Sequence, residues 1–317
     1  MAAVNPVGTP VGTPAATPAA PAATPSPLWL GVALAAIRPR TLTAAFAPVA
    51  VATAFAVANG VARYGLAFAC LVSALLIQIG TNLANDYYDF KNGADTHERV
   101  GPQRVTQAGL VAPETVKAWA FATFGAAALL GVWLSFIGGL PILLVGVFSI
   151  LSGWAYTGGP YPLGYHGLGD LFVMVFFGFV ATLGTYWLQA GAVPGVLWAL
   201  SVPVGALATA ILVVNNLRDR HTDAKAGKRT LAVRLGRGAG QAEYVALLLC
   251  TFMTPVALVL VHALRPWALV SLAALPLALP PLKLVLGAEG AALGPALGGT
   301  ARLQLVFAAL LSLGLLL

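Results

Sequence analysis

Oxygen-bearing side chains that can bind a metal gather in two short stretches of this chain. The first stretch, residues 82–95, contains Asn82, Asn85, Asp86, Asp89 and Asp95. The second, residues 215–223, contains Asn215, Asp219 and Asp223. The 317 residues include only ten Asp and Glu, so three of them within ten positions are a marked concentration. Each stretch ends a long apolar run, and the two clusters are therefore the first candidates for chemistry.

The spacing inside each stretch aligns the polar side chains on a helix surface. Residues 82, 85, 86 and 89 follow i, i+3, i+4 and i+7, and residues 215, 219 and 223 follow i, i+4 and i+8. Converging carboxylates repel one another unless a cation lies between them. Oxygen ligands without His or Cys favour Mg²⁺, which completes its shell with water and substrate phosphate. The two clusters therefore predict a magnesium site.

Basic residues accompany both clusters, and they are Arg99, Arg104, Arg218, Lys225, Lys228 and Arg229. Carboxylates that hold a metal beside cations that hold phosphate oxygens would suit a metal–diphosphate ligand. Two alternatives stay open at this point. The charged pairs could be solvated salt bridges at helix ends, and the lysines after Gly227 could be charges that only set the orientation in a membrane. Two similar clusters at corresponding places favour the functional interpretation.

The elements that must position these clusters are membrane helices. Charged residues make up 9% of the chain, hydrophobic residues 59%, and the mean hydropathy is +0.87. Apolar runs of roughly 20 residues, the length that crosses a bilayer as a helix, recur throughout. We predict an all-α polytopic membrane protein with nine transmembrane helices around a central cavity. The predicted spans are 41–59, 65–88, 115–137, 140–157, 168–190, 196–217, 241–262, 265–286 and 301–317.

The basic residues test this arrangement. Nine spans place 15 of the 17 Lys and Arg on one side of the membrane and leave only Arg63 and Arg265 on the other. Such a bias identifies the cytoplasmic side, so both clusters are expected in cytoplasmic loops. The net charge of +7 is explained in the same way, and we expect a lipid bilayer, not nucleic acid, as the partner.

The chain divides into two parts of unequal size. Residues 1–27 are a low-complexity stretch of Ala, Pro, Thr, Val and Gly, which predicts a disordered or polyproline-like tail. Residues 28–317 form the membrane domain. Within it, Asn85-x3-Asp89-x3-Gly93 is echoed by Asp219-x3-Asp223-x3-Gly227, which hints at two similar halves that face each other across the cavity.

The two motifs resemble those of the UbiA superfamily of intramembrane aromatic prenyltransferases, Asn-Asp-x2-Asp and Asn-x3-Asp-x3-Asp. The finer pattern resembles the branch that acts on 1,4-dihydroxy-2-naphthoate in menaquinone synthesis. The stretches that carry it begin at Arg38-Pro-Arg-Thr-Leu42, Gly101-Pro-Gln-Arg104, Tyr156-Thr-Gly-Gly-Pro160 and Gly227-Lys-Arg-Thr. The wide spacing from Asp89 to Asp95 also fits this branch. Asp170 is a departure, because a Glu would fit the branch equally well.

The resemblance implies an enzyme that transfers a polyprenyl group from polyprenyl diphosphate to 1,4-dihydroxy-2-naphthoate, with loss of CO₂ and diphosphate, to give demethylmenaquinol. It implies Mg²⁺ as cofactor and a bacterial cell membrane as location. The expected catalytic residues, which are also metal ligands, are Asp86, Asp89, Asp219 and Asp223. Further ligands are expected among Asp95, Asn82, Asn85 and Asn215. The expected substrate-binding residues are Lys91, Arg104, Gln107, Lys228, Arg229 and Tyr156.

Three other interpretations remain open from the sequence. A prenyltransferase of the same superfamily could use another aromatic acceptor. A cation-coupled secondary transporter would use two similar halves, but its site usually lies near the middle of the bilayer and not at one interface. A membrane scaffold that only binds a partner would not require so dense a set of paired acids and bases.

Overall fold

Helices make up most of the chain that the structure describes. The computed structural model describes residues 2, 29–95 and 100–317. Apart from residue 2, the predicted tail 1–27 lies outside the described residues, as does Arg99. The longer helices are α1 (Trp29–Ile37), α2 (Pro39–Ala58), α3 (Tyr64–Lys91), α4 (Pro113–Ala155), α6 (Ala181–Ala190), α7 (Gly195–Lys225), α9 (Arg237–Leu260), α10 (Leu275–Gly287) and α11 (Gly294–Leu316). The shorter ones are η1 (Leu163–His166), α5 (Gly169–Val173), the π-helical segment η2 (Met174–Val180), α8 (Leu231–Leu235), η3 (Pro266–Ala274) and η4 (Gly290–Leu293).

Eight stretches of the described chain are long and apolar enough to cross a membrane, and one of them contains two of the predicted spans. This stretch is α4, whose 43 residues are interrupted at Gly139, where φ is +72° and the backbone is not helical. Phe124 and Gly153 lie on opposite sides of this break, yet a Cβ on Gly153 would lie 3.4 Å from the Phe124 ring. The chain therefore reverses at Gly139, and α4 is the pair of spans predicted as 115–137 and 140–157. The all-α membrane fold is confirmed.

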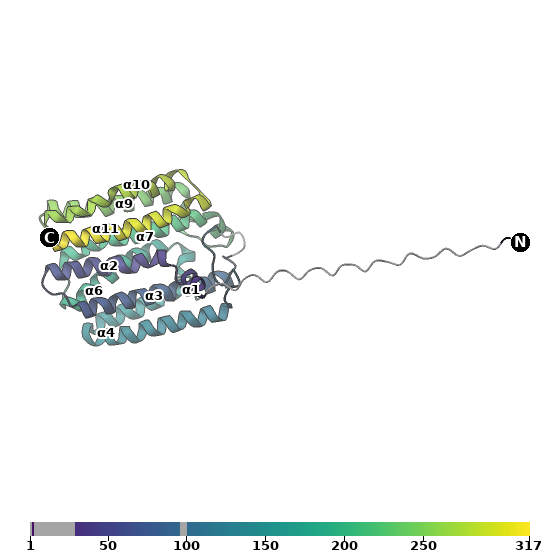
Figure 1. Cartoon of the computed structure of the whole chain (residues 1–317), viewed down its shortest axis with the longest axis horizontal. Coiled ribbons are helices and arrows are strands. Elements are labelled where there is room, and N and C mark those ends of the chain that lie inside the picture. Colours follow the sequence, from purple (N-terminus) through teal and green to yellow (C-terminus); the bar gives the residue numbers. More distant parts are fainter. Residues whose placement is uncertain (1, 3–28, 96–99) are drawn as a thin grey trace.

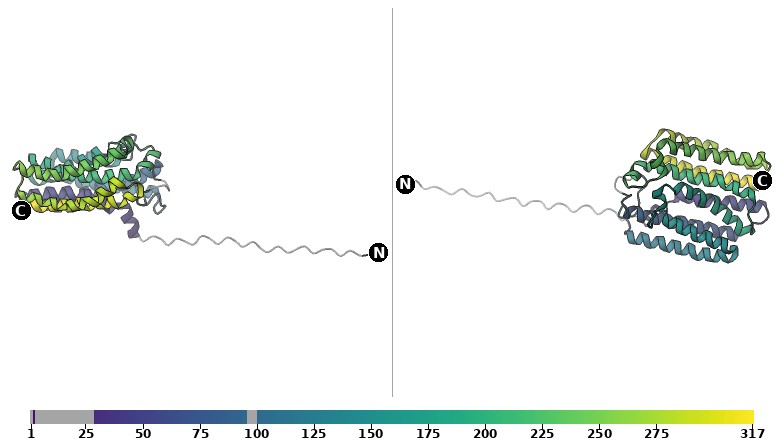
Figure 2. Two further views of the ribbon diagram at one scale, coloured as in Figure 1. Left: turned by 90° about the horizontal axis from the view of Figure 1, so that it is seen from above. Right: turned by 180° about the vertical axis from the view of Figure 1, so that it is seen from behind.

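The spans run antiparallel, side by side, so that their connections alternate between two ends of the bundle (Figure 1). The C-terminus lies at one end. The helix α1 and the loops that follow α3 and α7 lie at the other end in all three views (Figures 1 and 2). The two polar clusters belong to the ends of α3 and α7, so the fold brings them to one face of the bundle.

The last span is longer than its sequence indicated. We predicted a start at residue 301, but α11 begins at Gly294. The predicted span left Gly298 and Gly299 in the preceding loop. In the structure both residues belong to α11, and a Cβ added to Gly299 would lie 3.4 Å from Pro281 of α10. Close helix packing therefore uses the small residues that a loop would also use.

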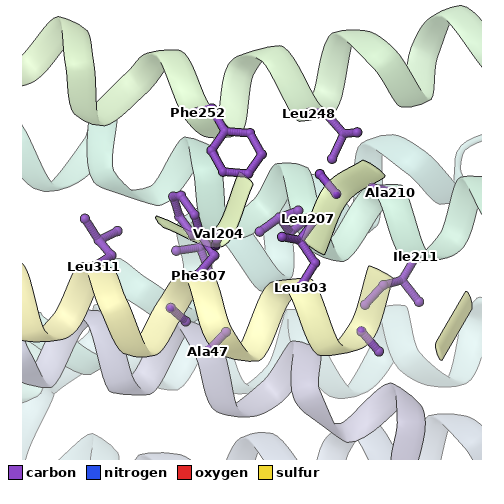
Figure 3. Close-up of a cluster of buried hydrophobic side chains, with 14 of the residues drawn as sticks. Ala47, Val204, Leu207, Ala210, Ile211, Leu248, Phe252, Leu303, Phe307 and Leu311 are labelled. Atoms are coloured by element: carbon purple, nitrogen blue, oxygen red, sulfur yellow. The ribbon is translucent and has the colours of Figure 1, made fainter. Parts of the chain in front are cut away.

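The main core lies among α2, α7, α9 and α11 (Figure 3). Leu207 of α7 and Leu303 and Phe307 of α11 are fully buried there, and the ring of Phe307 meets that of Phe252 in α9 edge to face. Lipid tails are as apolar as these side chains, so association within a bilayer rests on close packing and not on the exclusion of water. This packed region holds α7 rigidly, and α7 carries the second cluster.

Small residues bring η2 against α7. A Cβ on Gly205 would lie 2.6 Å from the Met174 sulfur and 2.8 Å from the Cα of Gly178. Only glycine allows the two backbones to approach this closely. The contact fixes the π-helical segment, and such segments are frequent at functional sites in proteins. Three side chains of this segment, Phe176, Phe177 and Val180, line the cavity described below.

The helices α3 and α7 end in the same way. In each helix, the third residue from the end is an Asp whose backbone carbonyl accepts the N–H of the second residue after the cap. The distance is 2.8 Å from Ala94 N to Asp89 O and 2.8 Å from Lys228 N to Asp223 O. The residue directly after each cap is a glycine with positive φ, +72° at Gly93 and +73° at Gly227. This is the Schellman arrangement, which requires a left-handed residue. The repeated Asp-x3-Gly spacing therefore corresponds to a repeated helix end.

Candidate active site

A cavity of about 650 Å³ opens between the spans at the end of the bundle that holds both clusters. Its deep walls are apolar and include Val49, Leu134, Ile142, Phe176 and Leu188. Its polar end, which we call the cavity mouth, is lined by Asn85, Asp89, Arg104, Asn215 and Lys228. The cavity therefore has the shape and polarity for a ligand with a polar head and a long apolar tail.

The charged side chains of the cavity lining are mostly basic. Among the described residues that line it, Asp89 is the single carboxylate. The basic residues of the lining are Arg38, Arg40, Arg104, Arg218 and Lys228. The remaining acids of the clusters lie behind this layer, where they are buried and contact the basic residues or the backbone. The space itself is therefore suited to a ligand with several negative charges.

Asp89 is the centre of the contacts at the mouth. One of its oxygens, Oδ1, accepts a hydrogen bond from the Tyr165 hydroxyl at 3.0 Å. The other, Oδ2, accepts one from Arg104 Nη2 at 3.2 Å and lies 3.9 Å from Lys228 Nζ. The carboxylate of Asp223 also lies 3.9 Å from Lys228 Nζ. Lys228 thus joins the cluster of α3 to that of α7, and the structure brings the two predicted clusters together.

The charge states of Lys228 and Tyr165 follow from these surroundings. Burial lowers the pKa of Lys228, but the carboxylates of Asp89, Asp223, Asp219 and Asp95 together raise it more, and the net shift is upward. Lys228 is therefore an ammonium at neutral pH. Burial and the adjacent Asp89 carboxylate both raise the pKa of Tyr165 above its ordinary value, so its hydroxyl stays protonated and donates. The Lys228 ammonium also lies 5.5 Å from the centre of the Tyr165 ring.

Asp95 and Arg104 form a second ion pair beside the mouth. Arg104 Nε lies 3.2 Å from Asp95 Oδ2, and both side chains are buried. Arg104 is therefore held between Asp95 and Asp89. The two carboxylates offset the hydration energy that the guanidinium loses on burial, and they fix its position at the cavity.

Asp86 lies outside the cavity lining and contacts the backbone of the loop after α3. The side chain is 0% exposed. Its two oxygens accept N–H groups from Val105 and Thr106, each at 3.2 Å. Arg38 Nη2 lies 3.9 Å from the same carboxylate. The helix face predicted to carry all four polar residues is therefore divided, because Asn82, Asn85 and Asp89 line the cavity and Asp86 is turned to the loop.

Asn82 fixes the junction between α1 and α2. Its amide nitrogen donates to the Ile37 carbonyl at 2.8 Å and to the Thr41 hydroxyl at 3.0 Å. Arg38 in turn donates to the Asn82 carbonyl at 3.1 Å. Arg38 has φ +58°, a left-handed conformation that is costly for a residue other than glycine and is kept only where the surroundings impose it. These contacts hold the Arg38 guanidinium at the cavity.

On α7, Arg218 donates hydrogen bonds to two polar side chains of its own helix. Its Nε and Nη2 donate to the two oxygens of Asp219 at 2.8 and 2.6 Å, which is a bidentate pair. Nη2 also donates to the Asn215 side-chain oxygen at 2.7 Å. Arg218 and Asn215 line the cavity, and Asp219 lies behind them. Asp219 therefore orients a cation toward the cavity.

The predicted substrate-binding residues separate into two groups. Arg104, Lys228 and Tyr156 line the cavity. Lys91 is exposed, and its Nζ lies 3.4 Å from the Tyr87 hydroxyl, so its placement gives no support to the predicted role. Arg229 is exposed and contributes its backbone, whose N–H donates to the Tyr165 carbonyl at 2.9 Å. Gln107 is half-buried and lies outside the described lining of the cavity.

Several residues at the site were not among the predicted site residues, and Arg40 and Arg218 of the lining are two of them. Tyr165 donates to Asp89, Arg38 lines the cavity, and the Thr157 hydroxyl donates to the Asn85 side-chain oxygen at 2.8 Å. Tyr165 and Thr157 belong to a Gly-rich loop with no charge, so nothing in the composition distinguishes them. The sequence did contain a signal for Arg38. This basic residue directly precedes Pro39, and proline is common at the first position of a helix.

The donor set of the mouth fits Mg²⁺ bound by few protein ligands. Within the described part of the chain, no three His, Cys, Asp or Glu side chains are grouped to hold a metal ion. Asn85 and Asp89 both line the cavity and offer oxygens one helical turn apart. Mg²⁺ is usually bound through one or two carboxylates, with waters and substrate phosphates as its other ligands. The residues present therefore fit the ion, and the full predicted ligand set stays a prediction.

Known proteins share both the sequence pattern and the fold. The UbiA prenyltransferase family matches residues 45–295. A 1,4-dihydroxy-2-naphthoate octaprenyltransferase of Mycobacterium tuberculosis is 43% identical over 242 residues, which are 76% of this chain and 82% of the relative. The protein of the same name from Mycobacterium leprae is 40% identical over 272 residues, 86% of this chain and 91% of the relative.

A solved structure gives an independent match of the fold. The structure of a UbiA homologue from Archaeoglobus fulgidus bound to DMAPP and Mg²⁺ superposes with a TM-score of 0.62 at 15% identity, over 90% of this chain and 98% of that one. The predicted resemblance is confirmed by the match to the family and by these relatives. The chain belongs to the UbiA prenyltransferase family.

Proposed function

We propose that this protein transfers a polyprenyl group from polyprenyl diphosphate to 1,4-dihydroxy-2-naphthoate, with loss of CO₂ and diphosphate, and so forms demethylmenaquinol in menaquinone biosynthesis. The names of the relatives, at 40 and 43% identity over most of their length, support this acceptor. The observation that carries the proposal is the cavity itself, with a cationic mouth above apolar walls.

The cavity matches the donor substrate in both of its parts. The diphosphate has several negative charges, and Arg38, Arg104, Arg218 and Lys228 supply the cations for it. The hydrocarbon tail fits against the deep apolar walls. These walls also exclude water, which would otherwise capture the allylic carbocation before the aromatic ring reaches it.

Prenyl transfer breaks the bond between the allylic carbon and the diphosphate oxygen. The bond electrons go to the diphosphate, so negative charge grows at the mouth as the bond lengthens. Preorganised cations stabilise such charge strongly in a site shielded from water. The electron-rich ring then forms the new carbon–carbon bond at the carbon that bears the carboxylate, and that carboxylate leaves as CO₂. The Lys228 ammonium, Arg104 and Arg218 are the groups placed for the leaving diphosphate.

Magnesium is proposed as the cofactor, with Asn85 and Asp89 as the ligands that face the cavity. Mg²⁺ bound at the mouth supplies further neutralisation of the leaving diphosphate. The name of the Archaeoglobus structure, which includes DMAPP and Mg²⁺, supports this choice. We further propose that the mouth faces the cytoplasm of a bacterial cell and that the protein resides in its plasma membrane. The predicted spans place 15 of the 17 basic residues on the side of the mouth, which is typical of the cytoplasmic side.

The test is a direct assay of the purified protein with polyprenyl diphosphate, 1,4-dihydroxy-2-naphthoate labelled in its carboxyl group, and Mg²⁺. We expect labelled CO₂ and a prenylated product in equal amounts, and loss of both with EDTA. A parallel reaction with 4-hydroxybenzoate tests the alternative acceptor. Product formed from 4-hydroxybenzoate and not from the naphthoate would contradict the proposed acceptor. Product undiminished by EDTA would contradict the proposed cofactor.

A further inference from the structure

The two aspartates of the first motif have different surroundings. Asp89 lines the cavity and contacts three polar side chains there. Asp86 is one helix turn earlier, is fully buried, and lies outside the cavity lining. Its two oxygens each accept one backbone N–H, from Val105 and Thr106. A carboxylate in this position already has the hydrogen bonds that a buried charge requires.

The loop that Asp86 holds delivers a cation to the cavity. Val105 and Thr106 directly follow Arg104, and all three residues are buried. Arg104 reaches Asp89 and Asp95 at 3.2 Å each. Further along, the Arg104 carbonyl accepts the Ala108 N–H at 2.9 Å, so the loop is a compact turn and not a free strand of chain. Fixing two consecutive N–H groups beside Arg104 therefore fixes where the guanidinium enters the mouth.

We propose that Asp86 is a positioning residue, which holds the 104–106 backbone and thereby places Arg104 for the diphosphate, and that it is not a metal ligand. This revises the role predicted for Asp86 from spacing alone. The substrate part of this inference rests on the proposed function, whereas the contact between Asp86 and the loop does not.

Two kinetic quantities separate the two roles of Asp86. In Asp86→Asn, one of the two acceptors becomes an amide N–H₂ that faces a backbone donor, so the loop loosens. We expect the KM for polyprenyl diphosphate to rise by about tenfold, because hydrogen bonds to a charged group are among the stronger ones. The Mg²⁺ concentration for half-maximal rate should stay within about twofold of wild type, whereas it should rise clearly in Asp89→Asn. Asp89→Asn is the matched control, since it makes the same chemical change one turn away.

A double substitution tests whether Asp86 acts through Arg104. Arg104→Gln should raise the KM for the diphosphate in the wild-type background and much less in Asp86→Asn, because the cation is already displaced there. Independent residues would instead give additive effects on the free-energy scale. Additive effects, or a shift of the Mg²⁺ requirement in Asp86→Asn as large as that in Asp89→Asn, would overturn the proposal.

Hydrogen exchange of the wild-type protein provides a readout that needs neither catalysis nor a variant that folds. A positioning Asp86 keeps its bonds to the loop when metal is added, so the amides of Val105 and Thr106 should be equally or better protected in Mg²⁺ with inorganic pyrophosphate than in EDTA. A ligand Asp86 would have to release these amides, and faster exchange in Mg²⁺ would overturn the proposal. Failure of the prenyl-transfer assay with unchanged protection would reject the function and leave the contact between Asp86 and the loop supported.

Discussion

The ends of α3 and α7 share one backbone design but stabilise their carboxylates differently. Both helices close with Asp at the third position from the end and a left-handed glycine after the cap. On α7, Arg218 of the same helix pairs with Asp219 and Asn215. On α3, the partners come from outside the helix, because Asp86 holds the loop backbone and Asp89 contacts Arg104 and Tyr165.

The difference indicates how the site is built. The α7 end is complete within one helix, since its main polar contacts lie within five residues. The α3 end is complete only after the loops that follow α3 and α4 have docked on it. Lys228, the second residue after the α7 cap, then bridges Asp223 to Asp89. We therefore expect substitutions that break the Arg218–Asp219 pair to lower stability as well as activity, and those at Asp86 and Asp89 to act mainly on substrate binding and rate.

The largest expected effect on stability comes from Arg218→Gln. It leaves Asp219, which is 6% exposed, without its bidentate partner. Removing one member of a buried ion pair costs about 3–5 kcal/mol. SDS-driven unfolding in mixed micelles measures this loss. The control is the double variant Arg218→Gln/Asp219→Asn, which removes both charges and should recover most of the stability. If the double variant were as unstable as the single one, the pair would not be the source.

Asp89→Asn is expected to have the largest effect on the reaction. It removes the carboxylate that faces the cavity and contacts Arg104, Lys228 and Tyr165. The turnover rate should fall by about 10²–10³-fold, which is the usual result of removing one preorganised electrostatic group. The measurement is kcat in the prenyl-transfer assay, with unfolding in SDS as the check that the variant folds. A rate within about tenfold of wild type would contradict the central place given to Asp89.

Tyr165→Phe is expected to have a smaller effect. It removes one hydrogen bond to the Asp89 carboxylate and keeps the ring beside Lys228. We expect kcat/KM to fall by about tenfold. The raised pKa of Tyr165 means that the hydroxyl is neutral from about pH 6 to about pH 9. The ratio of wild-type to variant kcat/KM should therefore be constant over that range. A ratio that falls toward one as the pH rises would show that Tyr165 ionises in the active range.

The smallest effect is expected at the two matched glycines. Gly227→Ala and Gly93→Ala each place a Cβ in open space, so the cost is only that of a left-handed alanine, about 1 kcal/mol. Because the two helix ends have the same geometry, both substitutions should lower stability in SDS by the same amount. Asn tolerates this conformation better, and Gly227→Asn should cost less. A much larger loss at only one of the two sites would show that the ends are not equivalent.

The sequence was informative wherever a single physical signal decided the structure. Apolar runs located the spans, and the charge distribution placed both clusters on one face. The Asp-x3-Gly spacing located two equivalent helix ends. The turn at Gly139 was predictable because a run of 43 residues is about twice what a bilayer accommodates.

The sequence was less informative about which side chains contact one another. Residues 82, 85, 86 and 89 share a helix face over about two turns. Their spacing could not show that a distant loop binds Asp86 and leaves Asp89 to the cavity. Tyr165 and Thr157 reach the site through tertiary contacts of an uncharged loop. Lys91 lies near the cluster in sequence, but its side chain contacts the Tyr87 hydroxyl and lies outside the described lining of the cavity.

The central claim is that the two helix ends form one diphosphate site, and the affinity for an unreactive analogue tests it most directly. The dissociation constant of farnesyl thiodiphosphate in Mg²⁺ is measured by calorimetry for wild type, Asp89→Asn, Asp223→Asn and the double variant. We expect each single substitution to weaken binding by about tenfold and the double variant to be weakened by clearly less than the product, because both residues act through Lys228. An unchanged affinity in Asp223→Asn, or strictly additive losses, would contradict a single shared site.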